Sequence, residues 1–226
     1  MRILFVAADP MEFRGMLARS TEVRPSSAPV RFAREARIGA HHALLIANGM
    51  GWARAAAAVD SGDTFRPDAI VSTGFCGALD ERLSVADIVV ATAVVGDGRD
   101  CPARSVGPRA GVIVSLDHVA QTAVEKQKLR KSGAIAVEME AAAVGKAAAD
   151  RGIPFYCVRA VTDLAGETFA NDFNRALRGD GHLDTISILR GALCRPRSRI
   201  PELLRLRRRC VRASEALGEF IVGCRF

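Results

Sequence analysis

The chain lacks several features that would place it in other classes of protein. Its 226 residues contain no apolar run of about 18 residues and no charged leader followed by an apolar segment, so neither a membrane-spanning nor an exported protein is expected. None of its six cysteines forms a Cys-x-x-Cys pair, and its four histidines show no metal-ligand spacing. We therefore expect reduced thiols, no metal site and a cytoplasmic location.

Aromatic side chains are also scarce. They make up 5 % of the chain, whereas 49 % is hydrophobic and alanine is abundant. This composition suits one domain with a sizeable core in which small side chains let the elements pack closely. No G-x-G-x-x-G follows the first predicted strand, so a dinucleotide-binding fold is unsupported.

Positive charge is concentrated at the end of the chain. The formal net charge is +7, and the segment from residue 190 onward holds ten arginines against three glutamates, which accounts for the whole excess. The rest is neutral, so a nucleic-acid-binding core is not expected. Residues 200–224 alternate apolar side chains and arginines at helical spacing, which predicts a basic amphipathic helix. Such a helix either docks on its own domain or lies on a membrane surface.

Strand and helix patterns alternate along the rest of the chain, which predicts an α/β fold. The run over residues 135–163 reads strand, helix, strand and predicts a parallel crossover. Residues 96–109 are predicted to form a surface loop. Strands are expected at residues 2–8, 43–47, 69–73, 87–93, 111–115, 135–137 and 155–161, and helices at 52–60 and 121–131. An alanine-rich helix is also expected after Glu140, closed by Gly152 and Pro154.

Three carboxylates follow predicted strands. Glu140 and Asp163 come at the ends of the strands in residues 135–163, and Glu12 follows the first strand. Ligands of open α/β sheets bind at the carboxyl ends of strands, so these side chains are candidates for one site although they are far apart in sequence. Each also has a structural interpretation, as a first-turn helix glutamate or a helix cap.

Two glycine-rich segments also follow strands: residues 48–51 and residues 74–78. A tight turn between strand and helix directs backbone N–H groups outward, where they can hold a phosphate or a sugar hydroxyl. Ordinary tight turns explain both segments equally well.

These residues together resemble the nucleoside phosphorylase and nucleosidase superfamily. The resemblance rests on five segments in order: VAADPMEF, NGMGWARAAAA, TGFCGALDERLSVADIVV, AIAVEMEAAAV and IPFYCVRAVTD. It covers roughly residues 1–190. The phrases SLDHVAQTAVEKQKLRKSGAIAVEME and HLDTISILRGALCRPRSRIPELLRLRRR are similar to one branch, the hopanoid-associated phosphorylases, which act on adenosylhopane.

The resemblance implies how such a site cleaves a purine N-glycosidic bond. Asp163 matches the acid that protonates the leaving base, and general acid catalysis contributes about 10² to 10⁴ in rate. Glu140 matches the residue that holds the ribose hydroxyls, and Met139 packs against the sugar. Glu138 is expected to serve structure or substrate orientation. Arg159 either binds phosphate or a carboxylate, or is a paired buried arginine.

The resemblance leaves the nucleophile open. Glu12 matches the residue that activates water in hydrolytic members of the family. Phosphorolytic members use backbone donors, a hydroxyl and an arginine, and here Gly49, Gly51, Thr73 and Gly74 are candidates to hold phosphate. Similarity to the branch favours phosphate as co-substrate, whereas Glu12 favours water.

Some residues depart from the pattern of the adenine nucleosidases. Phe75 stands where those enzymes have a small residue, residues 116–119 lack the aromatic that stacks on the base, and Thr162 replaces a serine. A larger or more apolar 5′ substituent would suit the altered pocket. Asp117 either orients His118, binds the base or caps a helix.

The resulting prediction is a three-layer α/β/α domain with a central mixed sheet, spanning residues 1–190, and a basic helical extension at residues 191–226. We expect phosphorolysis of an adenosyl compound such as adenosylhopane, with hydrolysis of methylthioadenosine or adenosylhomocysteine as the alternative. The resemblance implies a homo-oligomer, no cofactor and no metal, and a lipid-linked substrate would bring contact with a membrane. A non-catalytic nucleoside-binding protein and an RNA-binding arginine tail are the competing classes.

Overall fold

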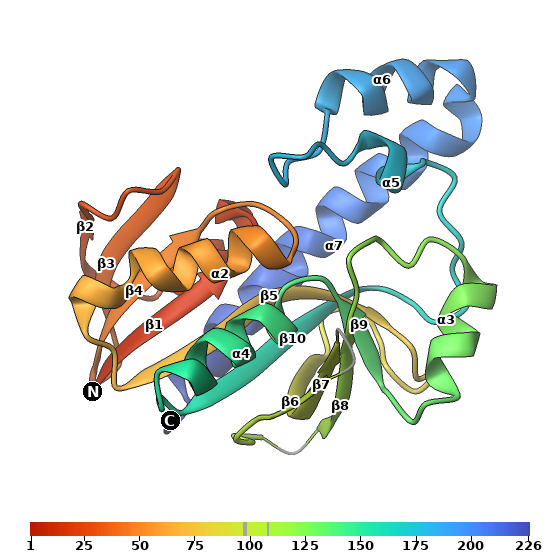
Figure 1. The fold of residues 1–226 in the computed structure, drawn as a ribbon. Helices are drawn as coiled ribbons and strands as arrows, with labels where there is room; N and C mark the ends of the chain where they lie inside the picture. Colours follow the sequence, from red (N-terminus) through yellow and green to blue (C-terminus); the bar gives the residue numbers. More distant parts are fainter. Residues whose placement is uncertain (97–98, 108) are drawn as a thin grey trace.

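The computed structural model describes residues 1–96, 99–107 and 109–226, and a ten-stranded sheet lies at its centre (Figure 1). The sheet order is β10-β6-β8-β9-β5-β1-β4-β3-β2, with β7 beside β6. β10 also pairs with β5, so β10, β6, β8, β9 and β5 close into a ring. The strands are β1 Arg2–Ala7, β2 Thr21–Pro25, β3 Phe32–Ile38, β4 His41–Ala47, β5 Ala69–Ala78, β6 Ile88–Gly96, β7 Arg99–Pro102, β8 Ala110–Ser115, β9 Ala136–Glu138 and β10 Phe155–Asp163.

Alternate side chains of β1 enter two separate hydrophobic clusters, as expected for a strand covered on both faces. Leu4 and Val6 join the alanine faces of α2 and α4, whereas Ile3 and Phe5 join residues of α1 and α7. This arrangement confirms the predicted three-layer fold with a mixed sheet. The helices are η1 Pro10–Phe13, α1 Arg14–Leu17, α2 Trp52–Ser61, η2 Asp63–Phe65, α3 Ala123–Arg130, α4 Ala141–Asp150, α5 Phe173–Ala176, α6 Thr185–Cys194 and α7 Pro196–Val222.

The C-terminal half of α7 is bound tightly to the domain. A Cβ atom on Gly218 would lie 2.1 Å from the carbonyl carbon of Gly15, so α7 and α1 touch backbone to backbone. The Ser214 hydroxyl accepts a 2.9 Å hydrogen bond from the Gly15 N–H. The sequence left two interpretations of the basic helix, docking on its own domain or lying on a membrane. For the C-terminal half of α7, docking on its own domain is the correct one. The predicted boundary between the domain and its helical extension, at residues 190 and 191, falls inside α6.

The second glycine-rich segment differs from its prediction. Residues 74–78 do not form a turn but continue β5, which pairs with β10 as far as Gly77. Gly74 has a φ of +135°, and a Cβ there would lie 2.3 Å from a carboxylate oxygen of Glu12. Glycine is needed at this position because the strand bends there and the Glu12 carboxylate approaches the backbone.

The predicted parallel crossover is also wrong. β9 pairs antiparallel with the end of β5, whereas β10 pairs parallel with β5, so β9 and β10 run in opposite directions. The last residues of β5 pair with both β9 and β10, which the strand–helix–strand pattern cannot show. The expected surface loop at residues 96–109 contains β7, which pairs with β6, and its positions 97, 98 and 108 lie outside the described residues. Over the described ranges, no helix is both long and apolar enough to cross a bilayer.

Candidate active site

A cavity of about 500 Å³ lies where the ends of β5, β9 and β10 meet the turn after β1 and the helices α5 to α7. All three candidate carboxylates line it. Of the other predicted residues, Phe75, Glu138 and Met139 also line it, whereas Gly49, Thr73, Gly74 and Arg159 do not. The remaining walls are mainly apolar and include Met50, Val137, Phe169, Phe173, Leu183, Ile188, Leu189, Leu203 and Leu206.

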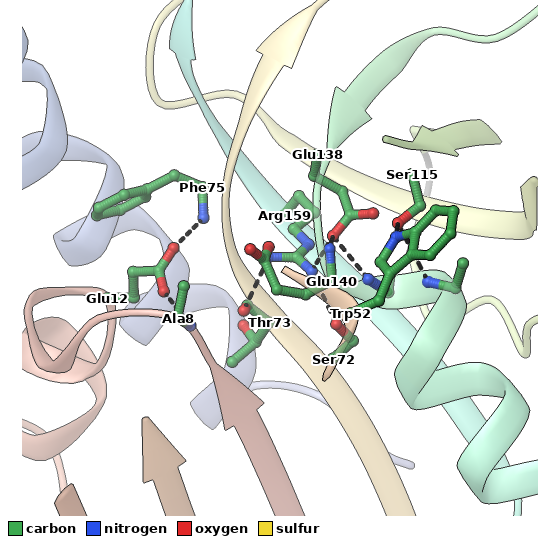
Figure 2. A network of polar contacts seen from close by, with 12 residues as sticks. Ala8, Glu12, Trp52, Ser72, Thr73, Phe75, Ser115, Glu138, Glu140 and Arg159 are labelled. Carbon is green, nitrogen blue, oxygen red and sulfur yellow. Dashed lines mark hydrogen bonds and ion pairs between the residues drawn. The ribbon is translucent and has the colours of Figure 1, made fainter. Parts of the chain in front are cut away.

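Glu12 is held by three backbone N–H groups from two segments, and Figure 2 shows its contacts with Ala8 and Phe75. Oε2 accepts hydrogen bonds from Ala8 at 2.8 Å and Asp9 at 2.9 Å, and Oε1 accepts one from Phe75 at 2.7 Å. Burial raises the pKa of Glu12, while the nearby Arg159 and the backbone N–H groups oppose that rise. The carboxylate is therefore fixed in place, and a raised pKa makes it a stronger base than an ordinary glutamate.

Glu140 lies across from Glu12 in the network drawn in Figure 2. Its Oε1 accepts a 3.1 Å hydrogen bond from the Gly51 N–H, and its Oε2 lies 3.7 Å from Arg159 Nη1. Burial and the neighbouring Glu138 raise its pKa to about 8. A buried carboxylate at a cavity wall can accept two hydroxyl hydrogen bonds at once, as a ribose diol requires.

This perturbed carboxyl makes the stability of the empty protein depend on pH. The pKa of Glu140 is about 8 in the folded chain against 4.5 as its ordinary value, so the stability it contributes is complete below about 4.5 and is lost as the pH rises to about 8. Glu140→Gln should leave stability near pH 5 almost unchanged and raise it at pH 8 by about 2 to 5 kcal/mol. Urea unfolding at both pH values measures this, and identical pH dependence in the two proteins would contradict it.

Glu138 and Arg159 form a buried pair beneath the cavity. Arg159 Nη2 contacts Glu138 Oε2, and the guanidinium also donates to Ser72 Oγ at 2.8 Å and to the Thr73 carbonyl at 3.0 Å. Glu138 Oε2 accepts the N–H groups of Glu140 and Ala141 at 2.9 and 2.8 Å, so it caps α4. The Arg159 side chain has no exposed surface. Arg159 is therefore a paired buried arginine. Glu138 stabilises the start of α4 and also lines the cavity, so its predicted role in substrate orientation stays a prediction.

The first glycine-rich turn directs its N–H groups into the protein. Gly49 donates to the Ala8 carbonyl at 2.9 Å, Met50 to Gly181 at 2.7 Å and Gly51 to Glu140 at 3.1 Å. A Cβ on Gly49 would lie 3.1 Å from the Asp180 carbonyl, so residues 180–181 lie directly on the turn. The N–H groups of Gly49, Met50 and Gly51 therefore all donate hydrogen bonds within the protein.

Asp163 is aimed by an irregularity in its strand. The pairing of β10 with β5 shifts register between Val161 and Asp163, and such bulges redirect side chains beside functional sites. The Thr162 hydroxyl donates to Asp163 Oδ1 at 3.0 Å. Burial raises the pKa of Asp163, as a carboxyl that must carry a proton near neutral pH requires.

Lys126 is the residue that sequence reasoning missed. Its ammonium contacts Asp163 Oδ2, donates to the Leu164 carbonyl at 2.9 Å and lies 5.3 Å from the centre of the Phe169 ring. The side chain is fully buried. Its only signal in the sequence is its spacing of three residues from Leu129 on the inner face of α3, and a lysine in a basic helix is normally assumed to be solvated.

Lys126 opposes the effect of burial on Asp163, which gives a testable pH dependence. Lys126→Met should raise the pKa of Asp163 further, so that the acid keeps its proton to higher pH. The alkaline limb of the activity profile should move up by about one pH unit or more. Lys128→Met, on the exposed side of the same helix, is the matched control. An alkaline limb that stays in place or moves down would show that Lys126 does not set this pKa.

His118 also lines the cavity, held between two carboxylates. Its Nδ1 lies 2.7 Å from Asp117 Oδ1 and its Nε2 lies 2.8 Å from Glu125 Oε1. Hydrogen bonds to Asp117 and Glu125 raise the pKa of His118. Of the roles predicted for Asp117, orienting His118 is therefore the one that the structure shows.

Comparison with known proteins gives a consistent result. Residues 2–110 and 107–180 match the family model described as the phosphorylase superfamily. A 5′-methylthioadenosine/S-adenosylhomocysteine nucleosidase of Staphylococcus aureus (strain JH9) is 31 % identical over 134 residues, which are 45 % of this chain and 59 % of that protein. The chain thus spans about three fifths of the length of the curated relatives that it matches.

Two solved structures show the same fold over nearly the whole chain. An S-adenosylhomocysteine nucleosidase from Streptococcus pyogenes, in complex with 5-methylthiotubericidin, has a TM-score of 0.75 and 21 % identity, covering 98 % of this chain and 94 % of that one. The futalosine hydrolase of Helicobacter pylori has a TM-score of 0.72 and 16 % identity, covering 98 % and 95 %.

Proposed function

Because the chain belongs to the phosphorylase superfamily, we propose that it is an enzyme that cleaves the N-glycosidic bond of a purine nucleoside and releases the base. The observation that carries this proposal is the meeting of Glu12, Glu140 and Asp163 around one cavity. They come from three distant segments, and burial raises the pKa of all three. Perturbed carboxyls gathered in one cavity are typical of active sites.

Each carboxylate has a distinct chemical task. Asp163 gives its proton to the purine N7 as the bond between ribose and base breaks, so that the base leaves as a neutral molecule. Glu140 accepts the ribose hydroxyls, and the positive charge that develops on the sugar in the transition state favours the ionised form of this buried carboxyl. Glu12 takes a proton from the attacking water. The proton that water loses balances the one that the base gains, so no cofactor or metal enters the reaction.

We favour water over phosphate as the nucleophile. The N–H groups of Gly49, Met50 and Gly51 all donate within the protein, and Arg159 is fully buried against Glu138. The backbone donors and the arginine that phosphate needs are therefore engaged elsewhere. Phosphorolysis of adenosylhopane, expected from the branch that the sequence resembles, has little support in this geometry.

The cavity walls favour an apolar 5′ substituent. Beyond the carboxylates, the cavity extends between Phe169, Phe173, Leu183, Leu203 and Leu206. Apolar side chains of this kind bind an alkyl or ring system better than a polar amino acid. An adenosine that carries a large hydrocarbon at C5′ suits both the carboxylates and these apolar walls. Such a substrate is lipid-linked.

We also propose a homo-oligomer. A groove of about 360 Å³ lies between α2 and α4, with Trp52, Ala56, Ala143 and Ala147 in its walls. Trp52 donates to Ser115 Oγ at 3.2 Å, which fixes the indole at this surface. The lining also includes Asp60, Lys146, Asp150 and Arg151, and a second copy of the chain can cover this groove with both apolar and charged contacts.

The deciding experiment incubates the protein with 5′-alkyl adenosines, with and without inorganic phosphate. Chromatography should show free adenine and free sugar at equal rates in both conditions. A sugar phosphate that forms only with phosphate would assign phosphorolysis instead. Bound adenosine with no free base from any nucleoside would make the chain a non-catalytic nucleoside-binding protein.

A further inference from the structure

Helix α6 exposes a row of apolar side chains, of which Leu189 also borders the cavity. Ile186, Leu189 and Leu193 are 59 %, 54 % and 71 % exposed, and their spacing of three and four residues places them along one face of the helix. We call these three side chains the α6 ridge. Single exposed apolar residues are normal, but a continuous row on one short helix marks a contact surface.

The other side of α6 is apolar as well. Ala192 is buried, and Ile188 lines the cavity together with Leu183 and, from α7, Leu203 and Leu206. Figure 1 shows α6 standing away from the sheet, beyond the N-terminal half of α7. The Arg199 guanidinium fastens the two helices by donating to the Gly191 carbonyl at 2.7 Å. Helix α6 therefore separates the cavity from the outside with apolar side chains on both of its surfaces.

Positive charge predominates around the ridge, although Asp172 and Asp184 lie beside Ile186 at the start of α6. Arg190 follows Leu189 on α6, and exposed arginines continue through the N-terminal half of α7 at positions 195, 197, 205, 207 and 208. The acidic residue within that half of α7, Glu202, is buried and accepts the N–H groups of Ala170 and Asn171 at 2.8 Å. An apolar row bordered by arginines complements a surface that is apolar inside and anionic at its rim, as a bilayer of anionic lipid is.

We propose that the α6 ridge docks the protein on anionic lipid bilayers, with the ridge among the acyl chains and the arginines at the phosphates. The apolar cavity wall on the same helix then receives the hydrocarbon part of a membrane-held nucleoside. The delivery of a membrane-held nucleoside to the cavity rests on the proposed function, whereas the docking on the bilayer does not. The contact is made by α6 and the adjacent half of α7, and not by the half of α7 that packs on α1.

Vesicle co-sedimentation of the full chain tests the docking. With vesicles of phosphatidylcholine containing about one third phosphatidylglycerol, wild type should bind, and binding should fall with added salt. Ile186→Ser with Leu193→Ser should weaken binding about tenfold or more, as should Arg190→Gln with Arg197→Gln. Val124→Ser, which alters an equally exposed apolar residue on the remote helix α3, should bind as wild type does.

Three outcomes would overturn the docking. These are failure of wild type to bind anionic vesicles, a serine double variant that binds as wild type does, and a serine double variant that runs as a smaller species on size-exclusion chromatography. The last would assign the ridge to contact between copies of the chain.

Cleavage assays separate this inference from the proposed function. Ile186 and Leu193 do not line the cavity. Their serine double variant should therefore cleave a water-soluble 5′-propyl adenosine at the wild-type rate, and it should cleave a vesicle-held 5′-hexadecyl adenosine about tenfold more slowly than wild type. Equal loss with both substrates would overturn delivery from the bilayer. Vesicle binding by a wild type that cleaves neither nucleoside would leave the docking standing and refute the proposed function.

Discussion

Replacing Asp163 with asparagine is expected to lower the rate of base release by about 10²- to 10⁴-fold. Asparagine keeps the shape of the side chain and can accept a hydrogen bond from Lys126, but it has no acidic proton for the purine N7. The leaving group must then depart as an anion, which raises the barrier by about 3 to 5 kcal/mol. Adenine release followed by chromatography under single-turnover conditions measures this loss.

A substrate that needs no acid provides the control for Asp163→Asn. A 4-nitrophenyl riboside releases a stabilised phenolate, so the variant should cleave it at nearly the wild-type rate. That result would also show that the fold and the sugar site are intact. Asp117→Asn, which alters an exposed carboxylate beside the cavity, is the matched substitution and should change purine cleavage little. Purine cleavage retained by Asp163→Asn would assign the proton to another group, with Lys126 the nearest candidate.

The three carboxylates could be identified from the sequence because each follows a predicted strand. The carboxyl ends of parallel strands gather at one edge, which accounts for Glu12 and Asp163, since β1 and β10 both run parallel to β5. β9 runs antiparallel to β5, so this rule does not account for the position of Glu140. The directions of the strands could not be predicted from the sequence in the same way. β9 pairs antiparallel with the last residues of β5, whereas β10 pairs parallel with the same strand, and neither pairing has a signal in the local sequence pattern.

Lys126 and the use of the Gly49 turn could not be predicted for a related reason. A buried lysine looks like any solvated lysine of a basic helix until its partner is placed 37 positions away in the chain. The N–H groups of a glycine-rich turn look available until Ala8, Gly181 and Glu140 are seen to accept from them. Both features consist of contacts between remote segments, and local patterns carry no record of such contacts.

Replacing Glu12 with glutamine is expected to lower hydrolysis by about 10²- to 10⁴-fold, because an amide cannot take a proton from water. The substitution also disturbs the local hydrogen bonds. If the glutamine oxygen faces the N–H groups of Ala8 and Asp9, its NH₂ group meets the Phe75 N–H, donor to donor. We therefore also expect a loss of stability of about 1 to 3 kcal/mol, measured by urea unfolding.

Chemical rescue distinguishes the loss of a base from this structural disturbance. Glu12→Ala leaves a space beside Gly74, and azide attacks the sugar without needing to lose a proton. Added azide should therefore restore adenine release in Glu12→Ala and form a ribosyl azide, while leaving Asp163→Asn inactive because that variant still lacks the acid. Hydrolysis by Glu12→Gln within about tenfold of wild type would place the activation of water elsewhere. A phosphate-dependent activity that survives in Glu12→Gln would return phosphate to the role of nucleophile, since phosphate needs no base to attack.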